Sequence, residues 1–282
     1  MKIEVAHTAG FCMGVTRAME LALKAARGAG MPLYTLGPLI HNNQAVASLE
    51  SEGIRSVDRQ EEVPAGSTVI IRAHGVRPEV RRQLETRNID VIDATCPHVV
   101  ASQRRIAEKS AAGYSVIIVG DRDHAEIKGL VGHARGQFAV ISSVEELRKV
   151  ELHEPVCLIA QTTFSENTYE EIKSEATAMF SEIVVFDSIC SSTEDRQREV
   201  LDLSGRVDAV IVVGGRHSAN TMRLAEIARS AGRKTIHVET ADELDTEDLR
   251  GLSSVGVTAG ASTPGWVIDE VLSAVRSAGG IR

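Results

Sequence analysis

The chain contains an internal repeat that is clearest around two of its cysteines. Asp93 and Asp187 each precede a cysteine by three residues, and those cysteines lie 94 positions apart, from residue 96 to residue 190. A Gln-Arg pair follows each cysteine at the same distance, at residues 103–104 and 197–198. Self-similarity of this kind indicates that one supersecondary unit occurs more than once, so the chain should fold as a series of like modules.

The same offset continues downstream through an apolar run and the polar residues that follow it. Residues 116–120 read Val-Ile-Ile-Val-Gly, and residues 210–214 read Val-Ile-Val-Val-Gly. Beyond these runs, the aligned polar positions are His124 with Ser218 and Glu126 with Asn220. Agreement over about thirty residues is hard to obtain by chance, and it therefore marks these polar positions as equivalent.

A fainter copy precedes these two. Its apolar run ends at Gly37, and His41 and Asn43 follow that glycine at the spacing seen in the other copies. The offset to the second copy is 83 between residues 37 and 120, and 84 between residues 12 and 96. We therefore predict three modules, over residues 1–95, 96–189 and 190–282.

Short apolar runs alternate with helical patterns along each module. The runs at 68–71, 156–159 and 255–257 read as strands, and 17–27 and 222–232 read as helices. This alternation predicts an α/β fold with parallel sheets, in which ligands bind beyond the carboxyl ends of the strands. Packing of three such modules around a common axis would bring their cysteines and strand-end loops to one central site.

Four cysteines, at positions 12, 96, 157 and 190, are widely separated and form no C-x-x-C pair. Cys157 lies inside an apolar run and is expected to be a buried core residue. Cys12, Cys96 and Cys190 each lie between an extended segment and a helix, where amide groups favour a thiolate. Three such thiolates could hold zinc or a [4Fe–4S] cluster with one iron not bound by the protein, and the absence of closely spaced ligands favours the cluster.

Polar side chains in the strand-end loops are suited to an anionic ligand. Imidazole, hydroxyl and amide groups can donate to phosphate oxygens, especially near helix N-termini. The candidates are His41, His74, His124, Thr162, Ser218, Asn220 and Ser262. Glu126 is the one carboxylate in the set, and beside such a ligand it is placed to deliver protons.

Charge and hydropathy exclude several classes of partner. The net charge is −8 and no Lys/Arg tract occurs, which argues against nucleic acid and anionic membranes. The apolar runs are too short to span a bilayer, and the first residues lack the apolar core of a signal peptide. We therefore expect a cytoplasmic protein.

The motifs together resemble one family, the 4-hydroxy-3-methylbut-2-enyl diphosphate reductases of the non-mevalonate isoprenoid route, over nearly the whole chain. The resemblance rests on Gly10-Phe-Cys-Met-Gly-Val15, His41-Asn42, Arg72-Ala-His-Gly-Val76, Asp93-Ala-Thr-Cys-Pro97, His124-Ala-Glu126, Gln161-Thr-Thr163, Ile189-Cys190 with Arg196-Gln197, Ser218-Ala-Asn220 and Val257-Thr-Ala-Gly-Ala-Ser262. Two departures stand out: Ala219 replaces a serine that the family often carries, and Ala125 replaces the usual proline.

The resemblance implies a pseudo-threefold trefoil around one [4Fe–4S] cluster, with Cys12, Cys96 and Cys190 as its ligands. Two electrons and two protons would remove the substrate hydroxyl as water, with Glu126 as proton donor and Thr162 and His124 shaping the proton network. The implied diphosphate contacts are His41, His74, His124, Ser218, Asn220 and Ser262. The electrons would come from a small electron-transfer protein of the ferredoxin or flavodoxin type.

Two other functions stay open from the residues alone. A zinc-dependent hydrolase could use Cys and His ligands with Glu126 as base, and it would contain no iron or acid-labile sulfide. A non-catalytic iron–sulfur sensor could use the open iron for detection, and it would not need the diphosphate donors.

Overall fold

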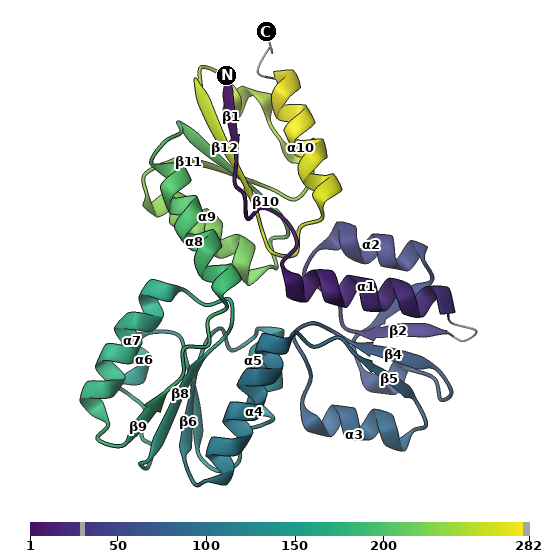
Figure 1. Ribbon diagram of the computed structural model, residues 1–282, viewed down its shortest axis with the longest axis vertical. Helices are drawn as coiled ribbons and strands as arrows, with labels where there is room; N and C mark the ends of the chain where they lie inside the picture. The colour runs from purple at the N-terminus through teal and green to yellow at the C-terminus, as the bar shows by residue number, and fades with distance from the viewer. Residues whose placement is uncertain (29–31, 279–282) are drawn as a thin grey trace. The chain divides into compact units, whose positions relative to one another are not determined.

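The computed structural model describes residues 1–28 and 32–278, which form three four-stranded parallel sheets with helices (Figure 1). The predicted α/β class with three parallel-sheet modules is confirmed. The first sheet contains β2 (Leu33–Leu36), β3 (Ile54–Val57), β4 (Thr68–Ile71) and β5 (Asp90–Asp93). The second contains β6 (Ser115–Val119), β7 (Phe138–Ile141), β8 (Val156–Ala160) and β9 (Ile183–Val185). The third contains β1 (Lys2–Val5), β10 (Ala209–Val213), β11 (Lys234–Val238) and β12 (Ser254–Ala259).

A helix or a 3₁₀ turn lies between successive strands in each copy. The helices are α1 (Met13–Gly28), α2 (Asn43–Ser51), α3 (Pro78–Thr86), α4 (Pro97–Ala111), α5 (Ala125–Val131), α6 (Val144–Leu147), α7 (Glu166–Met179), α8 (Ser191–Ser204), α9 (Ala219–Ser230) and α10 (Gly265–Ala278). Short 3₁₀ turns occur at Gln60–Glu62, Ala241–Glu243 and Thr246–Leu249. None of the helices in the described part of the chain is long and apolar enough to cross a lipid bilayer.

The three sheets share one strand order. They run β3-β2-β4-β5, β7-β6-β8-β9 and β11-β10-β12-β1, so the strand that leads to each cysteine always lies at one edge. In the third sheet this edge strand is β1, whose residues Lys2–Val5 pair in parallel with Ser254–Val257 of β12. The sequence assigns β1 to the first module, but its backbone groups complete the sheet of the third.

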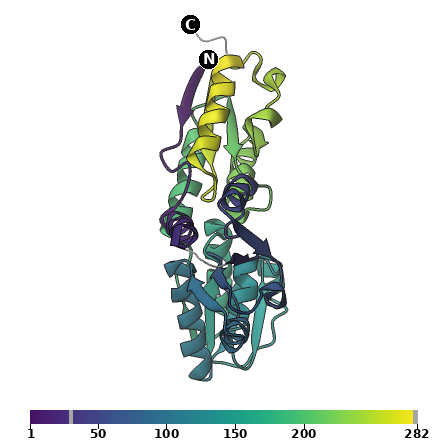
Figure 2. The same cartoon turned by 90° about the vertical axis from the view of Figure 1, so that its right-hand side faces the viewer.

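The second and third sheets are covered on both faces, since alternate residues of their strands belong to different apolar clusters. In the third sheet, Ile211 and Val213 pack with Val271 of α10, whereas Val210 and Val212 pack with Leu224 of α9. Figures 1 and 2 show α10 lying along this sheet. The strands therefore read as continuous apolar runs, as buried parallel strands do.

The chain divides into two compact units. Unit 1 comprises Met1–Thr16, Ile40–Ser48 and residues 191–278, and it contains the third sheet. Unit 2 comprises residues 17–28, residues 32–39 and Leu49–Cys190, and it contains the first and second sheets. Each unit carries part of the predicted site.

Candidate functional site

The three predicted ligand cysteines occupy one recurring backbone arrangement. The amide N–H of each cysteine donates to a carbonyl in the turn that follows a central strand. The pairs are Cys12 with Ala261 at 3.1 Å, Cys96 with Ala73 at 2.9 Å, and Cys190 with Thr162 at 3.0 Å. All three cysteines are partly exposed. Cys12 lies in unit 1, and Cys96 and Cys190 lie in unit 2.

Each of these cysteines immediately precedes a helix. The carbonyl of Cys12 accepts the amide of Thr16, and the carbonyl of Cys96 accepts the amide of Val100, both at 2.9 Å. Pro97 occupies the first turn of α4, where its missing N–H costs nothing. A thiol at the start of a helix lies close to the positive end of the helix dipole, which favours the thiolate that metals bind.

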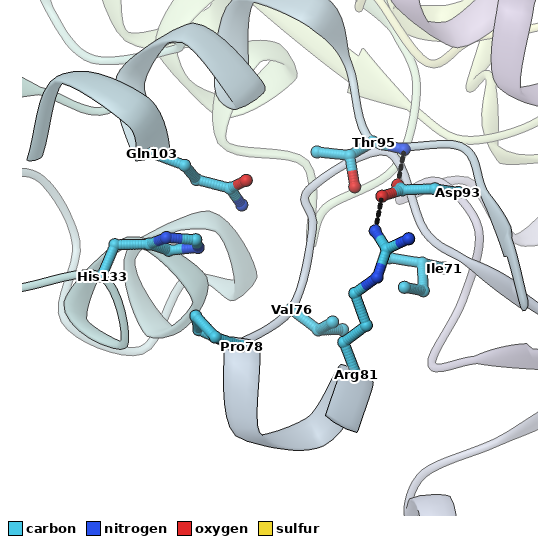
Figure 3. A pocket seen from close by; sticks show the side chains of 8 residues that line it. All are labelled: Ile71, Val76, Pro78, Arg81, Asp93, Thr95, Gln103 and His133. Atoms are coloured by element: carbon cyan, nitrogen blue, oxygen red, sulfur yellow. Dashed lines mark hydrogen bonds and ion pairs between the residues drawn. The ribbon is translucent and has the colours of Figure 1, made fainter. Parts of the chain in front are cut away.

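The repeated aspartates anchor the strands that lead to two of the cysteines. Asp93 accepts from Arg81 of α3 at 2.7 Å and from the amide of Thr95 at 2.9 Å (Figure 3). Asp187, its counterpart, pairs with Lys173 of α7 at 3.0 Å. Both aspartates are thus paired with a basic side chain from a helix. The small pocket in Figure 3 adjoins this anchor and is lined by none of the predicted site residues.

Cys157 differs from the other three cysteines, as predicted. It is fully buried in the centre of β8, and burial raises the pKa of its thiol to about 11. A thiol with this pKa is almost entirely protonated near neutral pH, so it is suited to the core and not to metal binding.

Glu126 is a buried acid held by a single residue of the second module. One carboxylate oxygen accepts the amide of Thr162 at 2.8 Å, and the other accepts its hydroxyl at 2.7 Å. The side chain of Glu126 is only 1% exposed. Burial raises the pKa of Glu126 to about 7, and the two bonds from Thr162 oppose that rise. The group can therefore carry a proton near neutral pH and release it.

Two histidines lie close to this acid. Nδ1 of His124 accepts the amide of Glu126 at 3.2 Å and caps the N-terminus of α5. Because Nδ1 accepts in this bond, the neutral ring carries its proton on Nε2. The ring of His74 meets that of His124 edge to face, with 5.3 Å between the ring centroids. Unit 2 thus brings together His74, His124, Glu126 and Thr162.

In unit 1, the start of α9 carries a second cluster of predicted residues. Ser218 caps α9 by accepting the amide of Thr221 at 3.4 Å, and the hydroxyl of Ser262 lies 3.4 Å from that of Ser218. Asn220 is 3% exposed, and neither atom of its amide has a hydrogen-bond partner within residues 1–28 and 32–278. Buried polar groups are normally paired, so an amide left in this state at a helix N-terminus suits an anion.

The segment around His41 belongs to the same cluster, although it comes from the first module. The hydroxyl of Ser262 donates to the carbonyl of His41 at 3.1 Å. Gly215 lies against the same carbonyl, because a Cβ there would be only 2.9 Å from its oxygen. Unit 1 therefore brings together His41, Ser218, Asn220 and Ser262.

The sequence reasoning missed one buried hydroxyl in this cluster. Thr221 is fully buried, and its hydroxyl has no hydrogen-bond partner among the residues that the structure describes. Gly260 lies against it, because a Cβ at Gly260 would come within 1.9 Å of the Thr221 oxygen. The repeat could not single out Thr221, because its counterpart in the second module is the apolar Ile127.

Comparisons with known proteins cover nearly the whole chain. A family model described as LytB protein matches residues 3–276. A 4-hydroxy-3-methylbut-2-enyl diphosphate reductase from Citrifermentans bemidjiense is 43% identical over 98% of both chains. The protein of the same name from Aquifex aeolicus is 40% identical over 97% of this chain and 96% of its own.

Two solved structures are also similar. The E-1-hydroxy-2-methyl-but-2-enyl-4-diphosphate reductase of Plasmodium falciparum has a TM-score of 0.94 and 26% identity, over 98% of this chain and 88% of its own. A structure titled as (E)-4-hydroxy-3-methyl-but-2-enyl diphosphate reductase, the terminal enzyme of the non-mevalonate pathway, has a TM-score of 0.73 and 40% identity, over 98% of this chain and all of its own. The repeated cysteine turns and strand-end loops thus occur in a chain that belongs to the LytB protein family.

Proposed function

We propose that this chain is an oxidoreductase that converts 4-hydroxy-3-methylbut-2-enyl diphosphate into isopentenyl and dimethylallyl diphosphates. In this reaction the bond between C4 and its hydroxyl oxygen breaks. Two electrons and two protons are consumed, the oxygen leaves as water, and a new C–H bond forms. The observation that carries the proposal is the recurrence of one cysteine turn three times, in a chain with full-length relatives that are named as this reductase.

The cofactor we propose is one [4Fe–4S] cluster bound by Cys12, Cys96 and Cys190. Three partly exposed cysteines that each precede a helix fit a cluster with three protein ligands. Such a cluster supplies single electrons and an iron that the protein leaves open to the substrate.

We assign proton delivery to Glu126. Its raised pKa, near 7, lets it hold a proton at neutral pH, and the hydroxyl of Thr162 is bonded to its carboxylate at 2.7 Å. His124 holds the amide of Glu126 and so fixes the start of the helix that carries the acid. Thr162 and His124 would thereby orient the acid and extend its proton network.

We assign the diphosphate to the polar strand-end residues of both units. The buried amide of Asn220 and the hydroxyls of Ser218 and Ser262 offer donors at the start of α9 in unit 1. The full set of proposed contacts is His41, His74, His124, Ser218, Asn220 and Ser262. Ala219 offers only its backbone, so one contact there would come from an amide N–H.

The reaction also needs a source of electrons and a reducing environment. We propose a small electron-transfer protein of the ferredoxin or flavodoxin type as the donor. We also propose a cytoplasmic location, since an oxidising compartment would favour disulfides over the free thiolates that the cluster needs.

The test is an anaerobic iron and acid-labile sulfide count on the purified protein and on four single Cys→Ser variants. Cys12→Ser, Cys96→Ser and Cys190→Ser should lose the cluster and the activity. Cys157→Ser should keep both, with some loss of stability because a buried thiol is replaced by a hydroxyl. Zinc in place of iron, or loss of the cluster from Cys157→Ser alone, would contradict the assignment.

A further inference from the structure

Asn42 is a second buried amide in unit 1 with an unused donor. Its Oδ1 accepts the amide of Ala45 at 2.8 Å, and its own carbonyl accepts the amide of Val46 at 3.0 Å, so Asn42 caps the start of α2. The residue is 3% exposed, and its Nδ2 has no hydrogen-bond partner anywhere in the described residues. A helix cap needs only the oxygen of the amide, so the NH₂ group could remain in water. In Asn42 the NH₂ group is buried instead.

The orientation of this amide follows from the cap itself. A backbone N–H can be accepted by Oδ1 but not by an NH₂ group, so the bond from Ala45 identifies which end of the planar amide is oxygen. The NH₂ group therefore lies on the side of the amide away from the helix. Leaving a buried donor unpaired is unfavourable, so an NH₂ held there indicates a partner that binds from outside the chain.

Asn42 lies against the cluster at the start of α9. A Cβ at Gly215 would be 3.8 Å from the Cα of Asn42, and Gly215 itself lies three residues before Ser218. The preceding residue, His41, is bonded through its carbonyl to Ser262. The following residue, Asn43, is engaged elsewhere, because its amide donates to Glu239 at 3.1 Å.

The repeat sets Asn42 apart from its counterparts. At the spacing from the strand-end glycine that aligns His41 with His124 and Ser218, Asn42 aligns with Ala125 and Ala219. The first module thus places a long donor where the other two place a methyl group.

We propose that Nδ2 of Asn42 is a further donor to the diphosphate group of the substrate. This proposal rests on the proposed function, because it concerns the same anion. Asn42 would supply a side-chain donor to a cluster in which Ala219 offers none.

The probe is inorganic pyrophosphate, with its dissociation constant measured calorimetrically on the full chain purified anaerobically. Asn42→Ser keeps a capping oxygen but has no NH₂, and it should weaken pyrophosphate binding about tenfold or more, as expected for one hydrogen bond to a charged group. Asn42→Asp also keeps the cap but brings a carboxylate toward the anion, and it should weaken binding about a hundredfold. Thermal unfolding should show both variants folded, because Ser and Asp are both good N-caps.

Asn88→Asp is the matched control, because it makes the same chemical change at an exposed residue of unit 2. Its left-handed backbone, with φ of 55°, is one that Asp also tolerates, so its pyrophosphate binding should equal that of the wild type.

The outcomes separate this proposal from the one on which it rests. Wild-type binding by Asn42→Ser, together with weakened binding by Asn220→Ala, would overturn the role of Asn42 and leave the diphosphate site standing. Wild-type binding by both variants would overturn the assignment of the diphosphate to the polar residues at the start of α9. Weakening in both variants, with none in Asn88→Asp, is the result we expect.

Discussion

Two loops that the repeat aligns, residues 124–126 and 218–220, use one backbone arrangement for two different side-chain environments. In each, the first residue caps a helix and the third is buried in the first turn. The buried residue is Glu126 in one loop and Asn220 in the other. The acid has both of its oxygens bonded, whereas the amide has no partner within the described residues.

The difference has a local cause in the turns that accept the cysteine amides. The backbone carbonyl of Thr162 accepts the amide N–H of Cys190, and that of Ala261 accepts the amide N–H of Cys12. Thr162 and Ala261 therefore occupy equivalent places. Thr162 has a hydroxyl that binds the acid, and Ala261 has none to offer the amide. One module thus satisfies its buried group internally, whereas the other leaves its group without a partner in the described residues. This difference fits the roles we propose for them, a proton donor and a diphosphate contact.

The largest effect is expected from Glu126→Gln. The amide is nearly isosteric and can still hydrogen-bond, so substrate should bind with little change while proton delivery fails. Turnover measured anaerobically with a chemical reductant should fall about a hundredfold or more. Glu171→Gln makes the same change at an exposed residue and should keep full turnover. Near-normal kcat in Glu126→Gln would remove the acid from the mechanism.

A smaller effect of the opposite kind is expected from Asn220→Ala. Loss of a contact made equally in the ground and transition states raises KM more than it lowers kcat. We expect KM for the diphosphate substrate to rise about tenfold, as for one hydrogen bond to a charged group, with kcat changed much less. Asn167→Ala, at an exposed position of α7, serves as the control. A fall in kcat alone would erase the distinction between the two loops.

The two loops should also differ in how they respond to pH, because only one contains an ionisable group. The native pKa of Glu126, about 7, lies above the ordinary value of 4.5 for a glutamate carboxyl group. The native state therefore binds more protons than the unfolded state between these values, and stability falls as pH rises through that window. Across this window the wild type loses folding stability on the order of 3 kcal/mol. Glu126→Gln cannot titrate and should not show this loss. Denaturant unfolding of both proteins from pH 5 to pH 8 should show the variant gaining relative stability with pH, and a constant difference would contradict a buried, titrating acid.

The smallest effect is expected from Thr162→Val, which removes one of the two bonds to the acid and keeps the other. The hydroxyl bond lowers the pKa of Glu126, so its loss should raise that pKa further. The alkaline limb of the kcat–pH profile should then move upward by about one pH unit, the equivalent of one hydrogen bond to a charged group. A limb that moves downward would mean that another group titrates.

The sequence predicted the modular fold well because the repeat is local in each copy. The apolar runs at 116–120 and 210–214 became the central strands β6 and β10, since short buried runs between helices have few alternatives in a parallel sheet. The predicted helix at 222–232 starts three residues earlier, at Ala219, because Ser218 caps it. The place of β1 was not predicted, because the pairing of residues 2–5 with 254–257 joins the two ends of the sequence and leaves no local pattern.

The sequence could name candidate residues for the site, but it could not predict the bonds between them. The offset marked Glu126 and Asn220 as equivalent, but only the structure shows that Thr162 serves one of them. The motif His41-Asn42 gave no role for Asn42, because a capping asparagine looks the same in sequence whether its NH₂ faces solvent or the interior. Burial of a single atom depends on packing between segments far apart in the chain, and no periodicity records it.

The most direct test of the account is an anaerobic turnover experiment with 4-hydroxy-3-methylbut-2-enyl diphosphate and a low-potential chemical reductant. We predict that the protein, with its iron and sulfide intact, consumes two electrons per substrate and releases isopentenyl and dimethylallyl diphosphates. Glu126→Gln should bind pyrophosphate as the wild type does and yet form almost no product. Release of inorganic phosphate or pyrophosphate without use of the reductant would contradict the account.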